Sequence, residues 1–228
     1  MSTSIILAIE SPKAELHLAD APPLRALIEI EGRPAITHVL RQVRSLAFSK
    51  TMVLTTFPDE VQVAVSEFQG VEVKKSPGFS STMIRQVLGE LPPDDPIVVV
   101  NGDLPWVLAA EIGELLGAAA ETPDLFLSMV DTRALPGHVK KQSASFQEGT
   151  YCPGRAFAAV PRILLQGAAL ERVEALSVSP FELLKSLGPG FLFKLGLGMF
   201  SMGEFETELA KQLALPIQLL LMNTPGFA

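Results

Sequence analysis

The pattern of hydrophobic and polar positions in the first half of the chain alternates between short apolar runs and amphipathic stretches. Four apolar runs have the length of strands. One of them, PIVVVNGD, has no polar alternation, which is typical of a parallel strand covered by helices on both faces. We therefore predict strands at residues 4–9, 51–56, 71–74 and 96–103.

The stretches between these runs have the spacing of helices. Pro34 suits a helix start, and after it apolar residues recur every three or four positions through Leu46. Further helices are predicted from residue 59, over 80–89 and over 107–120. Strands and helices in alternation predict an α/β fold with a doubly wound, mostly parallel sheet and right-handed crossovers.

The second half of the chain changes character. A strand is predicted over 124–130, and the more polar stretch 138–160 predicts two edge strands around a turn at Glu148. Helical segments opened by Pro or Ser follow, and a final strand is predicted from Pro216. We expect one domain over residues 1–228, with a helical subregion at about 161–213.

The helices after Pro180 are unusually rich in Phe and Met. Such a surface can serve as a lid or a partner site, or as an amphipathic element on a membrane surface. Lysines are too sparse there for the usual membrane-binding face. We expect core packing or a homodimer contact through these C-terminal helices.

Composition narrows the function classes. The chain has 228 residues, 48% of them hydrophobic, which is enough for a sizeable core. Its net charge is −7 and no Lys/Arg cluster exceeds two residues, so a nucleic-acid partner is not expected. The single cysteine excludes an intramolecular disulfide, and the three histidines have no metal-ligand spacing. Any metal would therefore bind to carboxylates.

Targeting signals are also missing from the pattern. Charges or prolines interrupt the longest apolar stretches, and none reaches the roughly 18 to 20 residues that a membrane-spanning helix needs. The opening MSTSIILAIE has neither a basic leader nor a small-residue cleavage site. We expect no membrane span and a cytoplasmic location.

One acidic residue lies where an α/β sheet binds ligands. Asp103 follows the most apolar predicted strand, at the carboxyl end where ligands gather, and Gly102 before it allows close approach of the backbone. A carboxylate there suits Mg²⁺, which is commonly held by one or two carboxylates and substrate phosphates. Asp103 could equally cap the helix beginning near Pro105. The residues alone leave both readings open.

Several motifs together resemble the MobA-like nucleotidyltransferases, which have the nucleotide-diphospho-sugar transferase fold. IILAI (5–9) matches their first strand, LRALIEIEGRPAITHVLRQV (24–43) matches the block written PKALLPVAGRPLLEHVL, and VVVNGDLP (98–105) matches the strand that ends in a metal-binding aspartate. Residues 149–165 are similar to GTFTGGNLFLLDP of a bacterial subgroup, and 179–213 to its helical insertion.

The resemblance implies a Mg²⁺-dependent transfer of a nucleotidyl group from an NTP to a phosphate-bearing small-molecule acceptor, with release of pyrophosphate. Such reactions depend on positioning and charge neutralisation. By position, Asp103 would bind Mg²⁺ and Arg25, at the family's lysine position, would contact phosphate. The resemblance also implies a set of nucleotide-binding residues: Ala8, Ile9, Lys13, Ser76, Gly78, Ser80 and Asn101.

The sequence departs from the family at the phosphate loop, written L-A-A-G-x-G-x-R. Glu10 and Pro12 replace its glycines and Ala14 replaces its arginine, so a negative charge is gained while an amide donor and a cation are lost. One such charge at about 5 Å from a phosphate repels by roughly 3 kcal/mol. Lys13 would offset part of this only if its side chain turned inward.

Two further departures affect the metal and acceptor regions. The family's second metal-binding aspartate follows the last strand, and LLLMNTPGFA stops before it, so we expect a weaker metal site. Pro153 and Arg155 replace a glycine and an asparagine of the acceptor segment. Two hypotheses remain: an active nucleotidyltransferase, or an inactive member that acts as a nucleotide-binding, partner or regulatory protein.

Three single residues carry open alternatives. Trp106 directly follows the predicted metal loop and either stacks on a base or anchors the core. Cys152 is either a reactive thiol or a structural residue, and we expect the latter. His38 lies beside the apolar face of its helix, and we expect it at the surface or in packing.

Overall fold

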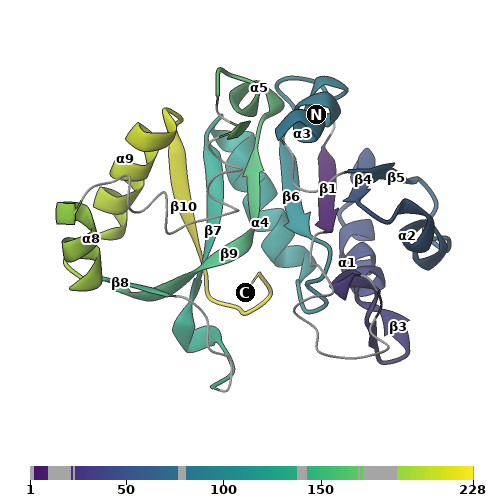
Figure 1. Cartoon of the computed structure of the whole chain (residues 1–228), viewed down its shortest axis with the longest axis horizontal. Coiled ribbons are helices and arrows are strands. Elements are labelled where there is room, and N and C mark those ends of the chain that lie inside the picture. Colours follow the sequence, from purple (N-terminus) through teal and green to yellow (C-terminus); the bar gives the residue numbers. More distant parts are fainter. Residues whose placement is uncertain are drawn as a thin grey trace.

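The structure is a computed structural model of the whole chain, with described residues at 3–9, 22, 24–76, 81–137, 143–168, 170–171 and 189–227. Its strands and helices follow the predicted alternation in the first half (Figure 1). The strands are β1 (Ser4–Ile9), β4 (Lys50–Thr55), β5 (Val71–Lys75), β6 (Ile97–Asn101), β7 (Leu125–Asp131), β8 (Ala144–Phe146), β9 (Gly149–Ala159) and β10 (Ile217–Met222), with a separate hairpin of β2 (Glu29–Ile30) and β3 (Arg33–Pro34).

One mixed sheet runs through the molecule in the order β10, β7, β9, β6, β1, β4, β5, with β8 paired to β9. The strands β1, β4, β5 and β6 form parallel pairs, as do β7 and β10. Among the described strands of this sheet only β9 runs the other way, antiparallel to β6, β7 and β8. The predicted fold class, a doubly wound and mostly parallel sheet, is confirmed.

The prediction that residues 138–160 form two edge strands is wrong for β9. This strand lies inside the sheet, antiparallel to β6 on one side and to β7 on the other, whereas β8 pairs with β9 alone. The reason is the length of β9: its last residues, 156–159, are small or apolar and mostly buried between two strands, while its polar first half extends past β6. Composition averaged over the whole stretch hid that difference.

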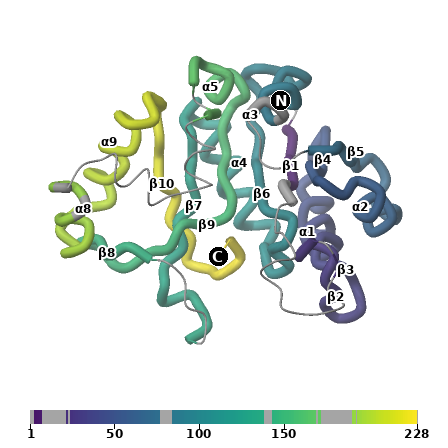
Figure 2. The backbone as a smooth tube through the Cα atoms, in the orientation of Figure 1, coloured from purple at the N-terminus to yellow at the C-terminus, as the bar shows by residue number. Residues whose placement is uncertain are grey.

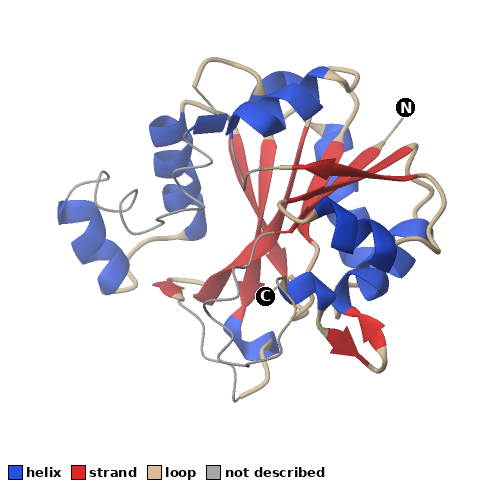
Figure 3. Ribbon diagram, turned by 45° about the vertical axis from the view of Figure 1, so that its right-hand side comes forward, coloured by secondary structure: helices blue, strands red, loops and turns tan. Residues whose placement is uncertain are grey.

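Helices cover both faces of the sheet because strand residues alternate between the two faces (Figure 3). In β6, Val98 and Val100 face one core while Ile97 and Val99 face the other. The first core is completed by α1 (Ala35–Arg44), α2 (Pro58–Ala64) and α4 (Ala109–Glu121), and the second by α3 (Ser81–Gly89), α5 (Pro161–Leu164) and α9 (Met202–Leu213).

The helical region after β9 is described only in part. Beyond α5 and α9 it contains α8 (Pro189–Gly196), and residues 172–188 lie outside the described part. One side of α8 packs with β8 and β9 in a small third core through Phe191 and Leu195, while Phe193 and Leu197 are exposed. Core packing is thus confirmed for part of this region, and the division of the chain into domains stays a prediction.

The helices of the described residues can be compared with the length and hydropathy of a membrane span. None of the helices there is both long enough and apolar enough to cross a bilayer.

Candidate functional site at the carboxyl edge of the sheet

Four parallel strands end side by side, which brings several predicted site residues together. Ala8 of β1 pairs in register with Asn101 of β6, and Ile9 pairs with Thr55 of β4. Ser76 follows β5, and its backbone N–H donates to the Thr55 carbonyl at 2.7 Å. Ser76 is buried, as is Thr55, which sequence reasoning missed although it is the last residue of a strand.

Arg25 lies on the same side of the sheet by topology. It opens the short 3-10 helix η2 (Arg25–Leu27), which leads through β2 and β3 into α1. The helix α1 runs back to the amino edge, where the Ser49 N–H donates to the Thr3 carbonyl, so α1 begins at the carboxyl edge. Figure 2 draws β2 and β3 low in the view, on the side of the C-terminus. The remaining predicted contacts, Lys13, Gly78 and Ser80, lie outside the described residues, as do Glu10, Pro12 and Ala14.

Asp103 follows β6 directly, and its carboxylate is held by Arg155 of β9. The Arg155 Nη2 lies 3.0 Å from both Oδ1 and Oδ2 of Asp103. The Asp103 side chain is 7% exposed and that of Arg155 28%. The helix-cap reading of Asp103 is wrong, because α4 begins only at Ala109 and the Glu111 carboxylate accepts from the Leu108 N–H at 2.7 Å.

The course of β9 brings Arg155 to this carboxylate. Between the register pairs Leu127↔Phe157 and Met129↔Pro153, β9 has two more residues than β7, which forms a bulge. The Ser128 hydroxyl fills the opening: it donates to the Ala156 carbonyl at 2.6 Å and accepts from the Ala156 N–H at 3.3 Å. The bulge interrupts regular pairing at residue 155, so its side chain can turn toward β6.

The bulge requires a glycine at position 154, because Ser128 lies too close for a side chain there. A Cβ added there would overlap the Ser128 hydroxyl and would lie 2.8 Å from the Ser128 Cβ and carbonyl oxygen. The glycine that the family resemblance places at this position is therefore retained for packing, whereas the neighbouring asparagine has become Arg155.

The C-terminal segment supports the site from below, near the lower ends of β9 and β6 in Figure 1. The Arg155 N–H donates to the Phe227 carbonyl at 2.8 Å, and the Phe227 ring is fully buried. The buried Glu111 carboxylate accepts from the Thr224 hydroxyl and from the Gly226 N–H. Burial raises the pKa of Glu111. We call these contacts of Glu111 with Thr224 and Gly226 the Glu111 clasp. Sequence reasoning missed it, because Glu111 and Thr224 are 113 residues apart.

A second aspartate–arginine pair lies at the end of β7. The Arg133 Nε lies 3.0 Å and 2.9 Å from the two carboxylate oxygens of Asp131, and the Arg133 side chain is 81% exposed. The hydrogen bonds from Arg133 lower the pKa of Asp131. Arginine thus meets aspartate at the carboxyl ends of β6 and β7, the two strands on either side of β9.

The metal site that the resemblance implies was tested against these contacts. Within the described ranges, no group of three or more His, Cys, Asp or Glu side chains could hold a metal ion. At Asp103 the structure offers one carboxylate, and both of its oxygens face a guanidinium. A divalent cation would share that carboxylate with a positive charge, so the donor set does not fit a resident Mg²⁺ while the pair is closed.

The open alternatives for single residues are now decided. Trp106 is 72% exposed, so the core-anchor reading is wrong and an aromatic face lies three residues from Asp103. Cys152 is fully buried in β9, as a structural residue would be, whereas reactive thiols need access. His38 is half-buried, and its Nε2 lies 3.0 Å from the Ile30 carbonyl, which confirms a packing position.

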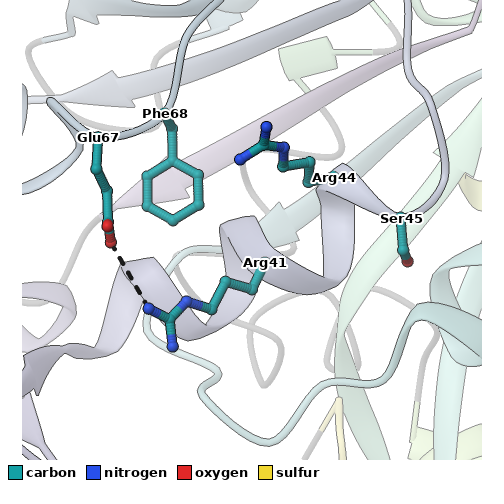
Figure 4. A pocket seen from close by; sticks show the side chains of 5 residues that line it. All are labelled: Arg41, Arg44, Ser45, Glu67 and Phe68. Atoms are coloured by element: carbon teal, nitrogen blue, oxygen red, sulfur yellow. Dashed lines mark ion pairs between the residues drawn. The ribbon is translucent and has the colours of Figure 1, made fainter.

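A surface pocket of about 430 Å³ lies elsewhere (Figure 4). Its lining residues come from the last turn of α1 and the segment before β5, so it lies at the amino edge, opposite Asp103. Glu67 in this pocket pairs with Arg41 at 3.8 Å and with Arg33 at 3.7 Å. Glu67 neutralises only part of this positive charge, but ligands of α/β sheets gather at the other edge.

Comparisons with known proteins agree with the fold. The model of the MobA-like NTP transferase domain matches residues 24–176. The chain belongs to this family. A 3-deoxy-manno-octulosonate cytidylyltransferase of Bradyrhizobium diazoefficiens is 27% identical over 187 residues, which cover 72% of this chain and 76% of that protein. Matches to two Bartonella proteins of the same name span 39% of their length.

Solved structures share the architecture of this MobA-like protein. A hypothetical transferase from Thermus thermophilus has a TM-score of 0.79 at 22% identity, over 100% of this chain and 95% of that one. Rv0371c from Mycobacterium tuberculosis H37Rv, in complex with manganese, has a TM-score of 0.54 at 14% identity, over 97% of this chain and 88% of that one. At these identities the likeness establishes the nucleotidyltransferase fold.

Proposed function

We propose that this protein is a nucleotidyltransferase that binds a nucleoside triphosphate at the carboxyl edge of its sheet. The nucleotidyl group would pass to a small-molecule acceptor with release of pyrophosphate. The observation that carries the proposal is the meeting of β1, β4, β5 and β6 around Asp103 in a chain of the MobA-like family. This edge is where open α/β sheets bind nucleotides.

The proposed chemistry depends on positioning and on positive charge. An acceptor oxygen attacks the α-phosphorus and the bond to pyrophosphate breaks, so negative charge develops on the leaving group. The protein carries a net charge of −7, and a triphosphate therefore needs local cations. We assign this role to Arg25, whose guanidinium can contact phosphate oxygens through two parallel hydrogen bonds.

The nucleotide is proposed to lie across the strand ends. Ala8, Ile9, Ser76 and Asn101 line that edge, and Trp106 offers an exposed ring on which a base can stack. CTP is the first nucleotide to test, because the Bradyrhizobium relative is named a cytidylyltransferase. The name of that relative indicates a sugar acid as its acceptor, whereas we propose an acceptor that bears phosphate; both are small anions.

An inactive nucleotide-binding member is the second candidate. The closed pair of Asp103 and Arg155 favours it, since it neutralises the carboxylate expected to bind metal. Glu10, Pro12 and Ala14 favour it too, as changes in the phosphate loop. In both candidates the chain binds a nucleotide, and only the first predicts turnover.

Calorimetry with each of the four nucleoside triphosphates, in EDTA and in excess MgCl₂, tests the shared part. We expect CTP to bind with a Kd of micromolar order, and Arg25→Ala to weaken it about tenfold. Arg162→Ala is the matched control, because this arginine pairs with Asp94 at the amino edge. Silence with all four nucleotides in both buffers would remove the proposal, and release of pyrophosphate with acceptor separates the two candidates.

The homodimer is a separate proposal. The helix α8 exposes Phe193, and Leu197 and Met199 are exposed just beyond its end; a second copy of the chain would cover all three. Sedimentation velocity on the full chain tests it: we expect a dimer that Phe193→Ser shifts toward monomer. A monomer at all concentrations would contradict the proposal.

A further inference from the structure

The contact between Asp103 and Arg155 joins two strands that are distant in sequence. The two residues are 52 positions apart, and the guanidinium Nη2 lies at 3.0 Å from each carboxylate oxygen. Most of the Asp103 side chain is covered, while more than a quarter of Arg155 faces solvent. The carboxylate is therefore largely shielded from solvent, while its cationic partner keeps a solvent-facing side.

Arg155 is held in place by contacts other than the ion pair. Its N–H is bound by the Phe227 carbonyl, and its neighbours Gly154 and Ala156 are fitted against Ser128 in the bulge. These contacts fix the backbone on both sides of residue 155. The backbone that carries the guanidinium is thus held at the carboxyl edge, within reach of Asp103.

We propose that Arg155 takes the position of a divalent cation at Asp103. Its charge neutralises the carboxylate and repels Mg²⁺ or Mn²⁺ from both oxygens, so metal binds there only after the pair is broken. Resting on the proposed function, we further assign the solvent-facing side of Arg155 to a phosphate of the nucleotide. Guanidinium groups suit this role because they bind two oxygens in one plane.

Manganese alone tests the metal part without any nucleotide. Mn²⁺ binding is measured by electron paramagnetic resonance on the wild type, Arg155→Asn, Asp103→Asn and the double variant. We expect Arg155→Asn to bind one Mn²⁺ at least about tenfold more tightly than the wild type, and the double variant to lose that gain. Arg162→Asn removes an equal charge at the amino edge and should change nothing.

Two results would overturn the inference. One is a wild type that binds Mn²⁺ tightly and loses it with Asp103→Asn. The other is a folded Arg155→Asn with no gain. Circular dichroism shows whether Arg155→Asn folds. If it does not, Arg155→Lys is used instead, because it keeps the charge, and its Mn²⁺ affinity should equal that of the wild type. Asp103→Asn should also leave Mn²⁺ binding unchanged.

Nucleotide titrations test the remaining part. The wild type should bind CTP equally well in EDTA and in MgCl₂, and Arg155→Asn should lose at least about tenfold in EDTA and regain it in MgCl₂. Wild-type binding that requires MgCl₂ would overturn the phosphate role of Arg155. If no variant binds any nucleotide, the proposed function fails, and the Mn²⁺ titrations still decide whether Arg155 excludes metal.

Discussion

The carboxyl ends of β6 and β7 carry the same pair of residue types, yet they are built differently. At β7, Asp131 and Arg133 are two residues apart, and the arginine is largely in solvent. At β6, Asp103 is paired with an arginine from another strand, which a bulge, a serine and the C-terminal segment position. The first pair needs only a local turn, whereas the second exists only when β9 lies inside the sheet.

This difference decides what each pair contributes. The two aspartates are about equally covered, with side chains 8% and 7% exposed, so the difference lies in the arginines. Arg133 is largely in solvent, where water and salt screen its charge. Arg155 is mostly covered, and breaking its pair leaves a partly desolvated charge. At Asp103 we therefore expect that loss of the arginine partner alters both stability and ligand binding. Asp131 serves as the comparison for this effect.

The largest expected effect comes from the bulge. Gly154→Ala places a methyl group on the Ser128 side chain and backbone, so we expect a loss of about 3 kcal/mol in the free energy of unfolding and a displaced Arg155. Urea denaturation measures it. Gly117→Ala in α4 is the control, because no atom lies within 4 Å of its added Cβ. Equal stability of the two variants would contradict the described bulge.

The clasp at Glu111 comes next. Glu111→Ala removes a buried acceptor of the Leu108 and Gly226 N–H groups, with an expected loss of about 2 kcal/mol in urea denaturation. The exposed Glu114, one turn on in the same helix, should lose little when changed to alanine. If both variants unfold alike, the C-terminal segment does not depend on Glu111.

The raised pKa of Glu111 adds a pH dependence with a known sign. Because its pKa is higher in the folded chain than the ordinary 4.5, its ionisation opposes folding, and stability falls as pH rises from 4.5 through the folded pKa. Glu111→Gln should remove this part of the stability profile. A variant whose profile above pH 4.5 matches the wild type would show that another group is responsible.

The third effect compares the two arginines directly. Arg155→Ala leaves the covered Asp103 without this partner and should cost about 1 to 2 kcal/mol, allowing for the exposed part of the pair. Arg133→Ala should cost less, because the Arg133 side chain is largely in solvent. Chemical denaturation of both variants in one buffer gives the ratio, and a ratio near one would mean that the β6 pair is no better supported than the β7 pair.

The sequence predicts the parallel half of the fold well because its information is local. The apolar run of β6 and the helical spacing of α1 each fit within a dozen residues, and Asp103 follows from its place after a strand. The position of β9 between β6 and β7 depends on contacts between residues that are distant in sequence, so no pattern within residues 149–159 predicts it. Arg155 stood out as a departure from the family, but its partner became visible only with the strand order.

The smallest expected effect is the change in stability with pH that the pair of Asp131 and Arg133 causes. Hydrogen bonds from Arg133 hold the pKa of Asp131 below its ordinary 3.8, so their stabilisation is present above that pH and is lost as pH falls through the folded pKa. Arg133→Ala should therefore flatten the acid side of the stability profile and leave neutral pH almost unchanged. Thermal melts of both proteins across that range measure it. If both proteins lose stability equally at acid pH, other carboxylates cause that loss. The Asp131–Arg133 pair would then contribute no measurable stability, unlike the contribution that we expect from Asp103 and Arg155.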